Sequence, residues 1–168
     1  MTRRQPRERP SGTLTITVWP SVRQPHGRRV RTSWTALAAR AANPSVYTEK
    51  YRVPRWSPAL FRDDYRRLAN VERVAAVVLD IDDGTARERV VGAFGAFVGF
   101  AHTTVRSTPE RPRWRLVMQL TRDISAAEYA RCWRAVAALA ERAGITPDYS
   151  AGDASRAWAV PACHTGGN

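Results

Sequence analysis

The sequence predicts a mixed α+β fold in which helices pack on one face of an antiparallel sheet. The first observation is a continuous apolar run over residues 73–82 that ends in acidic residues, which is typical of a central strand buried on both faces. The second is a capped amphipathic helix over residues 125–143. The third is the order of elements from residue 73 onward, which is strand, helix, strand, strand, helix, strand.

Length and composition indicate one folded, strongly basic protein. The chain has 168 residues, of which 43% are hydrophobic and 25% are charged, so it can bury a core of its own. Lysine and arginine number 27 against 15 acidic residues, which gives a formal net charge of +12. This excess predicts a polyanionic partner such as nucleic acid. The longest apolar run, residues 90–101, is too short to span a bilayer, so we expect no membrane association and a cytoplasmic location.

Three regions are expected along the chain. Residues 1–12 contain four arginines and little that is apolar, which predicts a flexible basic arm. We expect residues 13–72 to form a small N-terminal α/β lobe and residues 73–168 to form the larger lobe that holds the sheet. Together, residues 13–168 are expected to make a single compact domain.

The N-terminal lobe is expected to contain one strand and two helices. Alternating β-branched residues predict a strand over residues 13–19. Apolar residues on one face predict a helix over residues 34–42, with Thr32 or Ser33 as its cap. Ser57 and the proline after it have the pattern of a helix start. The apolar face of that second helix is expected to consist of Phe61, Tyr65 and Leu68.

The larger lobe is expected to follow the βαββαβ order of an RRM-like sheet. Ser125 and Glu128 are spaced as a capping box, and Gly144 ends the helix that they begin. After the strand at 73–82, the expected elements are a helix over 85–100, strands over 101–107 and 112–120, a helix over 125–143 and a last strand over 157–162.

Asp80 and Asp82 are the leading candidates for chemistry. They alternate with Leu79 and Ile81, so both carboxylates project from one face of the strand. At an effective dielectric near 20, two like charges about 5 Å apart repel by roughly 3 kcal/mol, a cost that a bound cation removes. Carboxylate oxygens select Mg²⁺ or Mn²⁺ rather than zinc. We therefore expect metal ligands here, with a solvated strand end as the alternative.

Arginines gather on the hairpin next to this strand. Arg113 and Arg115 share one face of the strand over residues 112–120, and Arg106 precedes the turn. Guanidinium groups beside carboxylates that hold a metal are suited to a nucleoside triphosphate. The alternative is an exposed, arginine-rich face of the hairpin.

Two-metal chemistry generally needs a further acid. The polar loop after the last helix offers Asp148 and Asp153. We expect Asp148 to be the third acid, with Asp153 as the alternative or as a cap or partner of Arg156. His102 is expected to be structural, although it precedes two threonines beside the site.

Three segments carry a recognisable pattern: VVLDIDDG, TTVRSTPERPRWRLVMQL and PDYSAGDASRAWAVPA, all within residues 73–162. They resemble the catalytic core of archaeo-eukaryotic-type primases, the primase-polymerase superfamily, in the forms found on phages, plasmids and other mobile elements. The resemblance implies an RRM-like catalytic lobe beside a small N-terminal lobe. It also implies three motifs: h-h-h-D-h-D, S-x-H and a later h-D.

Carried over by position, Asp80 and Asp82 match the first motif and Asp148 the last. The nucleotide-binding histidine of the family would fall near Arg113 or Arg115, where this chain has none, so Arg115 is the expected substitute. The resemblance implies two Mg²⁺ or Mn²⁺ ions held by the three aspartates. The arginines expected to bind the nucleotide are Arg115, Arg113, Arg106 and Arg156.

The implied activity is template-dependent nucleotidyl transfer from NTPs or dNTPs on single-stranded DNA, as in a DNA primase or primase-polymerase of a phage or mobile element. Template contacts are expected at Arg62, Arg66 and Arg67 and in the basic arm, mainly through phosphates. A replicative helicase is a further candidate partner.

The alternative function is a non-catalytic nucleic-acid-binding module of a replication initiator on the same RRM-like core. Such modules stack bases on exposed aromatic residues of the sheet. The central strand here carries aspartates where such a module would have aromatic or basic residues, which favours the enzyme.

Overall fold

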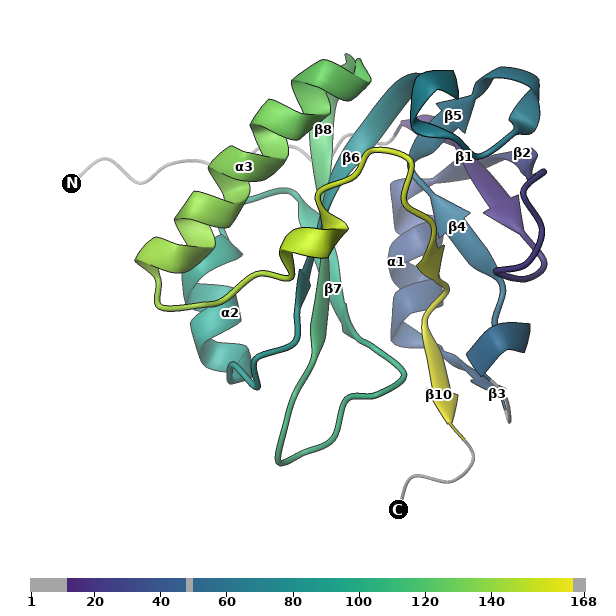
Figure 1. Ribbon diagram of the computed structural model, residues 1–168. Helices are drawn as coiled ribbons and strands as arrows, with labels where there is room; N and C mark the ends of the chain where they lie inside the picture. The colour runs from purple at the N-terminus through teal and green to yellow at the C-terminus, as the bar shows by residue number, and fades with distance from the viewer. Residues whose placement is uncertain (1–11, 48–49, 165–168) are drawn as a thin grey trace.

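A computed structural model describes residues 12–47 and 50–164 of the chain. Figure 1 shows two lobes side by side, with a sheet and two helices in the larger lobe and smaller sheets and one helix in the other. The expected basic arm, residues 1–12, lies outside the described residues except for Gly12. Within the described chain, no helix has the length and apolar character needed to cross a membrane. Its α-helices are α1 (Trp34–Ala42), α2 (Arg87–Phe94) and α3 (Ala126–Arg142).

The larger lobe is built on an antiparallel sheet with the strand order β5-β6-β8-β7. The expected central strand is confirmed, and its register places Asp80 opposite Arg115. On the far side of β8, Arg115 is opposite His102, so these three residues form a row across the sheet. The four strands are β5 (Ala59–Phe61), β6 (Val71–Ile81), β7 (Gly99–Thr103) and β8 (Trp114–Ile124).

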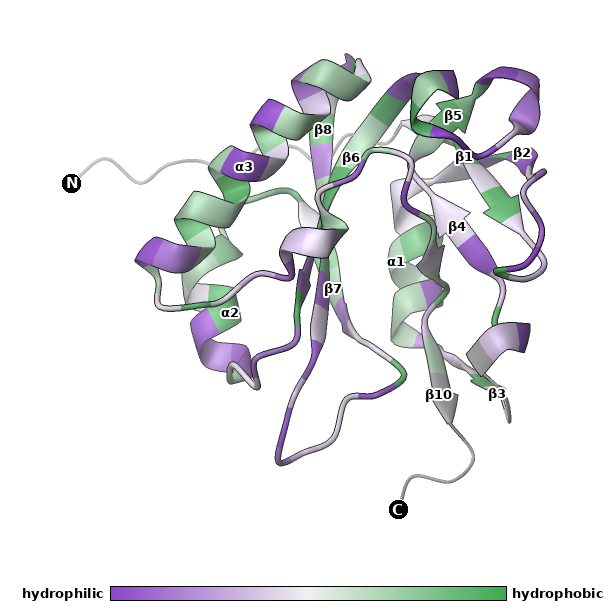
Figure 2. Ribbon diagram, viewed as in Figure 1, coloured by the Kyte–Doolittle hydropathy of each residue, from purple (hydrophilic) through white to green (hydrophobic). Residues whose placement is uncertain are grey.

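Both faces of this sheet are covered, which explains the continuous apolar run of β6. Leu79 and Ile81 lie in the core under α2 and α3, whereas Val78 packs with Trp56 and Trp158 of the smaller lobe. In Figure 2, hydrophobic colour covers much of β6, and α3 shows bands of both kinds, as an amphipathic helix should. The polar end of β6 therefore lies at the junction of the two lobes.

The smaller lobe has an antiparallel sheet with the order β2-β1-β4-β9 and a parallel pair, β3 with β10. The strand over 13–19 and the helix over 34–42 are confirmed, and Ser33 is the cap because its hydroxyl accepts from the backbone N–H of Ala36. The strands are β1 (Thr13–Trp19), β2 (Arg28–Ser33), β3 (Ser45–Tyr47), β4 (Arg55–Ser57), β9 (Trp158–Ala159) and β10 (Ala162–His164).

The expected last strand of the RRM-like order does not join the central sheet. Its residues form β9, which pairs with β4 because Trp158 packs against Trp56 in the smaller lobe. The place beside β6 is taken by β5, and the chain after α3 meets β6 through the bridge between Ile81 and Pro147. The fold is thus mixed α+β with mainly antiparallel sheets, and strands from each lobe cross the boundary expected at residue 72.

The helix expected from Ser57 is wrong. Residues 56–61 are all buried, and they run as β4 and β5 between the two lobes. The extended chain is favoured here because β4 pairs with β1 and β9, and β5 pairs with β6. The Ser57 hydroxyl does accept from a backbone N–H, that of Ala59, but it caps a turn. The 3-10 turns η1 (Lys50–Arg52), η2 (Arg62–Asp64) and η3 (Leu68–Asn70) surround this segment.

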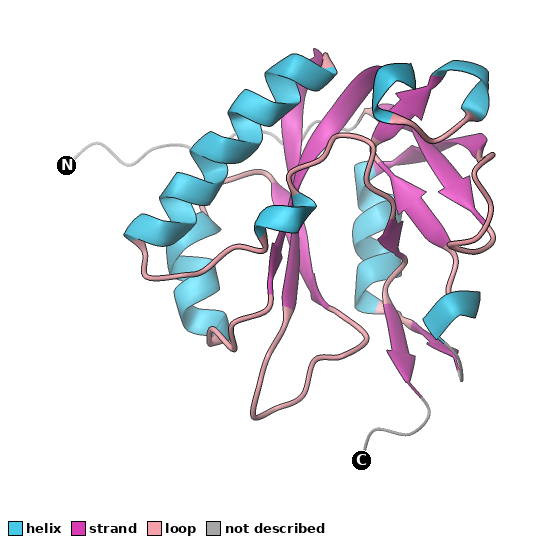
Figure 3. Cartoon of the chain, in the orientation of Figure 1, coloured by secondary structure: helices cyan, strands magenta, loops and turns pink. Residues whose placement is uncertain are grey.

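The helix expected over 85–100 ends early, at Phe94. Phe97 and Val98, which follow the helix, are 43% and 37% exposed. Strand pairing takes over here because Gly99 approaches β8 so closely that a Cβ would lie 2.1 Å from the carbonyl oxygen of Val117. Figure 3 shows the long loop that then joins β7 to β8. The capped helix of 125–143 is confirmed as α3 with its capping box.

Candidate functional site

A charged cavity of about 180 Å³ lies where the end of β6 meets the β7–β8 hairpin and β9. It has room for on the order of ten water molecules. Five arginines, three aspartates and one histidine line it, so its formal charge is +2 with the histidine neutral. A positively charged hollow of this kind attracts polyanions. The charged and histidine residues are Arg55, Asp80, Asp82, His102, Arg106, Arg113, Arg115, Asp148 and Arg156.

Asp80 and Arg115 form a buried ion pair with two contacts. Nε of Arg115 lies 2.6 Å from Oδ1 of Asp80, and Nη2 lies 3.0 Å from Oδ2. The two side chains are 9% and 10% exposed. The remaining nitrogen, Nη1, donates to the carbonyl of Ala159 in β9 at 3.0 Å, so Arg115 ties the sheet to the smaller lobe. Both carboxylate oxygens of Asp80 therefore have guanidinium partners.

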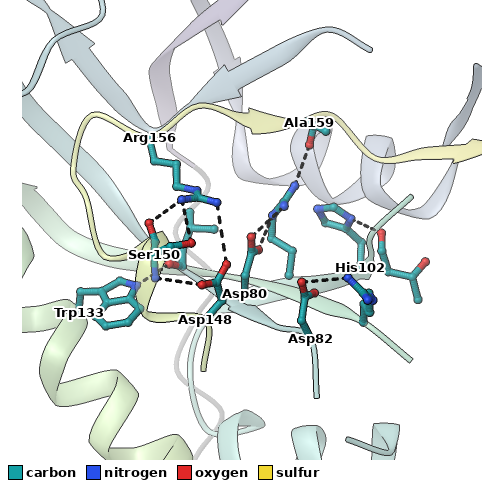
Figure 4. A network of polar contacts seen from close by, with 12 residues as sticks. Asp80, Asp82, His102, Trp133, Asp148, Ser150, Arg156 and Ala159 are labelled. Carbon is teal, nitrogen blue, oxygen red and sulfur yellow. Dashed lines mark hydrogen bonds and ion pairs between the residues drawn. The ribbon is translucent and has the colours of Figure 1, made fainter. Parts of the chain in front are cut away.

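Asp82, two residues after Asp80, is also paired with an arginine of the neighbouring chain segment. Its Oδ2 accepts from Nη1 of Arg113 at 3.1 Å, but the carboxylate is 45% exposed. The pair forms because Asp82 and Arg113 continue the same face of their strands beyond Asp80 and Arg115. Figure 4 shows Asp80 and Asp82 next to each other at this edge. Asp82 is thus the more accessible of the two carboxylates.

Asp148 reaches the cavity because its backbone is bonded to β6. Its N–H donates to the carbonyl of Asp80 at 2.9 Å. Its Oδ1 caps the 3-10 turn η4 (Tyr149–Ala151), and its Oδ2 lies 3.9 Å from Nη2 of Arg156. Asp153, the alternative third acid, accepts from Ser155 and does not line the cavity. Of the two loop acids, the structure places Asp148 at the candidate site.

Asp83 fixes the loop that carries Asp148. Its Oδ1 accepts from the N–H of Thr85 at 2.9 Å, and its Oδ2 accepts from the N–H of Thr146 at 2.7 Å. Partial burial raises the pKa of Asp83, but the hydrogen bonds from Thr85 and Thr146 outweigh that effect and lower it overall. One carboxylate thus joins the end of β6 to the chain two residues before Asp148.

His102 lies in the cavity wall with an unpaired nitrogen. Its Nδ1 lies 2.8 Å from the carbonyl of Thr103 and must donate, which leaves Nε2 unprotonated. Nε2 is buried and has no hydrogen-bond partner among the described residues. Burial, with the adjacent Arg115, lowers the pKa of His102 to about 4. The sequence predicts a structural histidine, and only the pairing of β7 with β8 brings His102 beside Arg115.

Arg55 is a cavity residue that sequence analysis missed. It projects from β4, a strand that the sequence did not predict. Burial lowers its pKa, and so does the proximity of Arg115, Arg66 and Arg156. Guanidinium groups crowded in this way favour the binding of an anion. No sequence signal identified Arg55, because its partners come from distant parts of the chain.

The sequence candidates thus fall into two groups. Those expected to bind metal or nucleotide line the cavity together: Asp80, Asp82, Asp148, Arg106, Arg113, Arg115 and Arg156. Those expected to bind DNA do not line it. Arg62, Arg66 and Arg67 lie in and after η2, and the guanidinium of Arg66 is 5.8 Å from the centre of the Trp19 ring.

The three aspartates are not arranged as a metal site. Within residues 12–47 and 50–164, no group of three or more His, Cys, Asp or Glu side chains could hold a metal ion. Carboxylate oxygens have the chemistry that Mg²⁺ and Mn²⁺ require, but guanidinium nitrogens contact both oxygens of Asp80 and one of Asp82. As they stand, these residues do not fit the expected pair of ions.

No family model matches this sequence, and no curated protein matches it. Among solved structures, the chain is similar to the AEP domain of the primase-polymerase of cyanophage S-2L. The two share 14% sequence identity, with a TM-score of 0.48 over 89% of this chain and 72% of that one.

Proposed function

We propose that this chain binds a nucleoside triphosphate in the charged cavity and transfers its nucleotidyl group, as a primase or primase-polymerase does on single-stranded DNA. The observation that carries the proposal is the convergence of three aspartates and five arginines from separate parts of the chain on one cavity. The motif resemblance of Asp80, Asp82 and Asp148 to archaeo-eukaryotic primases supports the same activity.

The arginines are suited to bind the triphosphate. Arg106 is exposed and Arg113 is partly exposed, so an incoming polyanion meets these two first. Arg115 is the most buried of these arginines, and Arg113, Arg115 and Arg156 each lie beside an aspartate. Guanidinium groups bind phosphate oxygens through two parallel hydrogen bonds, so a triphosphate can compete with the carboxylates for them.

The aspartates then become available to the reacting groups. Asp82 is already half-exposed, and the backbone N–H of Asp148 is bonded to the carbonyl of Asp80. A carboxylate that has lost its arginine partner can accept the proton of an attacking hydroxyl. Binding of two divalent ions by these aspartates stays a prediction, because the present arrangement does not fit them. Template contacts by Arg62, Arg66 and Arg67 also belong to the proposal.

A second candidate is a nucleic-acid-binding module that performs no chemistry. It is favoured by the pairing of Asp80, Asp82 and Asp148 with arginines, which leaves these three carboxylates without the arrangement of a metal site. Binding of labelled single-stranded DNA and of labelled nucleotide, each with and without Mn²⁺, separates the two functions. DNA binding without metal-dependent nucleotide binding supports the module.

The deciding experiment is primer synthesis and extension on a single-stranded DNA template with NTPs or dNTPs and Mg²⁺ or Mn²⁺. Asp82→Ala is the test variant because Asp82 is half-exposed and its loss spares the buried pair. Asp123→Ala is a matched control, since Asp123 has the same 45% side-chain exposure and is bonded to Arg73 far from the cavity. Products from the wild type and the control only, with DNA affinity retained or raised in Asp82→Ala, support the proposal. Equal products from all three proteins contradict it.

A further inference from the structure

Two exposed tyrosines lie on the edge of the smaller lobe, away from the cavity. Tyr51, in η1, is 42% exposed, and Tyr65, which follows η2, is 39% exposed. Neither of them lines the cavity. Large rings that stay half in solvent on a basic protein are typical of surfaces that stack planar groups.

The loop over residues 20–27 connects the two rings. Its Arg23 places a guanidinium 5.0 Å from the centre of the Tyr51 ring, and Arg52 places another at 5.9 Å. At its other end, the His26 ring lies 5.0 Å from the Tyr65 ring at an angle of 66°. In Figure 1 this loop follows β1 along the outer edge of the smaller lobe. Tyr51, this loop and Tyr65 form a continuous strip, which we call the tyrosine strip.

Backbone hydrogen bonds hold the Tyr65 end of this strip in place. The N–H of Arg66 donates to the carbonyl of Pro25 at 2.9 Å, and the N–H of Gly27 donates to the carbonyl of Asp64 at 2.9 Å. A Cβ at Gly27 would lie 2.6 Å from the Thr17 side chain, so only glycine allows this close approach. A surface that is fixed before binding loses little conformational entropy when a ligand arrives.

The turn before Tyr65 has a strained backbone. Asp63 and Asp64 are consecutive residues in the left-handed region, with φ of 54° and 53°. Arg29 holds the turn by donating to Oδ1 of Asp64 at 3.0 Å and to the carbonyl of Phe61 at 2.7 Å. The strained turn directs the chain so that Tyr65 lies against His26 and Arg66 lies over Trp19.

Positive charge runs from the strip toward the cavity. Arg23 and Arg52 lie beside Tyr51, and Arg66, which follows Tyr65, lies over Trp19. Arg66 is also near enough to the cavity residue Arg55 to lower its pKa, after the larger effects of burial and of Arg115. The turn before Tyr65 carries two acids: Asp64 is paired with Arg29, and Asp63 is exposed.

We propose that the tyrosine strip binds single-stranded nucleic acid, with unpaired bases stacked on Tyr51 and Tyr65 and phosphates bound by the neighbouring arginines. Bases stack on aromatic rings and on guanidinium planes, and arginines neutralise the backbone. A duplex hides its base faces, and an acidic peptide has none, so both fit less well. Only the role of this strand as a template rests on the proposed function.

The test is binding of a fluorescent oligo(dT) strand, measured by anisotropy over a range of salt concentrations. Tyr51→Ala and Tyr65→Ala are each expected to weaken binding about tenfold without changing the salt dependence, because stacking releases no counterions. Tyr→Phe at either position retains the affinity. Arg23→Gln lowers the slope of log affinity against log salt by about 0.7, the value for one phosphate contact on a single strand. Phe97→Ala is the matched control, since Phe97 is 43% exposed on the other lobe.

Oligo(U) and a DNA duplex serve as competitors. Competition by oligo(U) reports whether the strip distinguishes RNA from DNA. Equal affinity of the tyrosine variants and Phe97→Ala overturns the proposal, and so does equal competition by the duplex. Nucleotide binding in the cavity is measured separately on the same proteins. If the tyrosine variants lose strand binding but the wild type makes no primer or extension products, the strip proposal holds and the proposed catalytic function is wrong.

Discussion

Arg115 and Asp80 face each other across β8 and β6, and two hydrogen bonds of 2.6 and 3.0 Å join them below the surface. The same guanidinium also bonds to Ala159 in β9. A single arginine therefore neutralises the most buried aspartate of the cavity and connects the central sheet to the smaller lobe. Any ligand that draws Arg115 away changes both contacts at once.

Removing Arg115 is expected to cost stability. In Arg115→Gln, Asp80 keeps a buried charge without its partner, which typically costs about 3 kcal/mol of unfolding free energy. Urea unfolding at neutral pH measures this loss. Asp123→Asn, which breaks the exposed pair with Arg73, should change stability by less than about 1 kcal/mol. A loss in Arg115→Gln no larger than in this control would show that the buried pair is not a main structural link.

Metal binding is expected to depend on the nucleotide. In the free protein, Arg115 contacts both oxygens of Asp80, so Mn²⁺ alone should bind weakly. A triphosphate that engages Arg115 frees Asp80, and Mn²⁺ should then bind more tightly. Titration calorimetry with Mn²⁺, with and without a non-hydrolysable nucleotide, measures the difference. Mn²⁺ should also stabilise Arg115→Gln more than the wild type, and equal Mn²⁺ affinity under all these conditions would contradict the competition.

The buried His102 is expected to make the free energy of unfolding depend on pH. Its pKa falls from about 6.5 in the unfolded chain to about 4 in the folded protein, mainly through burial. The unfolded state therefore gains the proton first, and stability present above pH 6.5 is lost as the pH falls toward 4, by about 3 kcal/mol in all. In His102→Gln, the slope of unfolding free energy against pH should flatten in that window. Phe100→Leu, which changes the ring stacked beside His102 but keeps the imidazole, should retain the slope. An unchanged slope in His102→Gln would refute this assignment.

Local patterns predicted the parts of the site that depend on one or two neighbouring strands. The alternation of Asp80 with apolar residues and the shared face of Arg113 and Arg115 both follow from the pleat. The rest depended on tertiary contacts. Residues 56–61 form strands between the two lobes, which cover them. The last strand lies in the sheet of the smaller lobe because Trp158 packs there. Such burial is decided by distant residues, which the local pattern does not contain.

The same limit explains the cavity. Asp148 was a candidate because acids are needed near such a site, but its place follows from a backbone bond to Asp80 that no spacing predicts. Arg55 lay in an unrecognised strand, and His102 gained its importance only from the register of β7. Pairing of Asp80 and Asp82 with arginines was also unexpected. The sequence identified charges of both signs, whereas the structure shows that they bind one another.

Asp83 provides a last prediction, which concerns the position of Asp148 and not its chemistry. In Asp83→Ala, the N–H groups of Thr85 and Thr146 lose their carboxylate acceptor, so unfolding free energy should fall by about 1 kcal/mol at pH 7. The folded pKa of Asp83 is lowered, so its contribution is present above the unfolded value near 4 and disappears as the pH falls below it.

The gap between wild type and Asp83→Ala in urea unfolding should therefore close between pH 5 and pH 2. Because Asp83 does not line the cavity, nucleotide affinity should weaken only through displacement of the Asp148 loop, and Asp83→Asn should restore part of it. A stability gap that stays constant down to pH 2, or nucleotide affinity equal to that of the wild type, would mean that Asp83 does not hold the loop that carries Asp148.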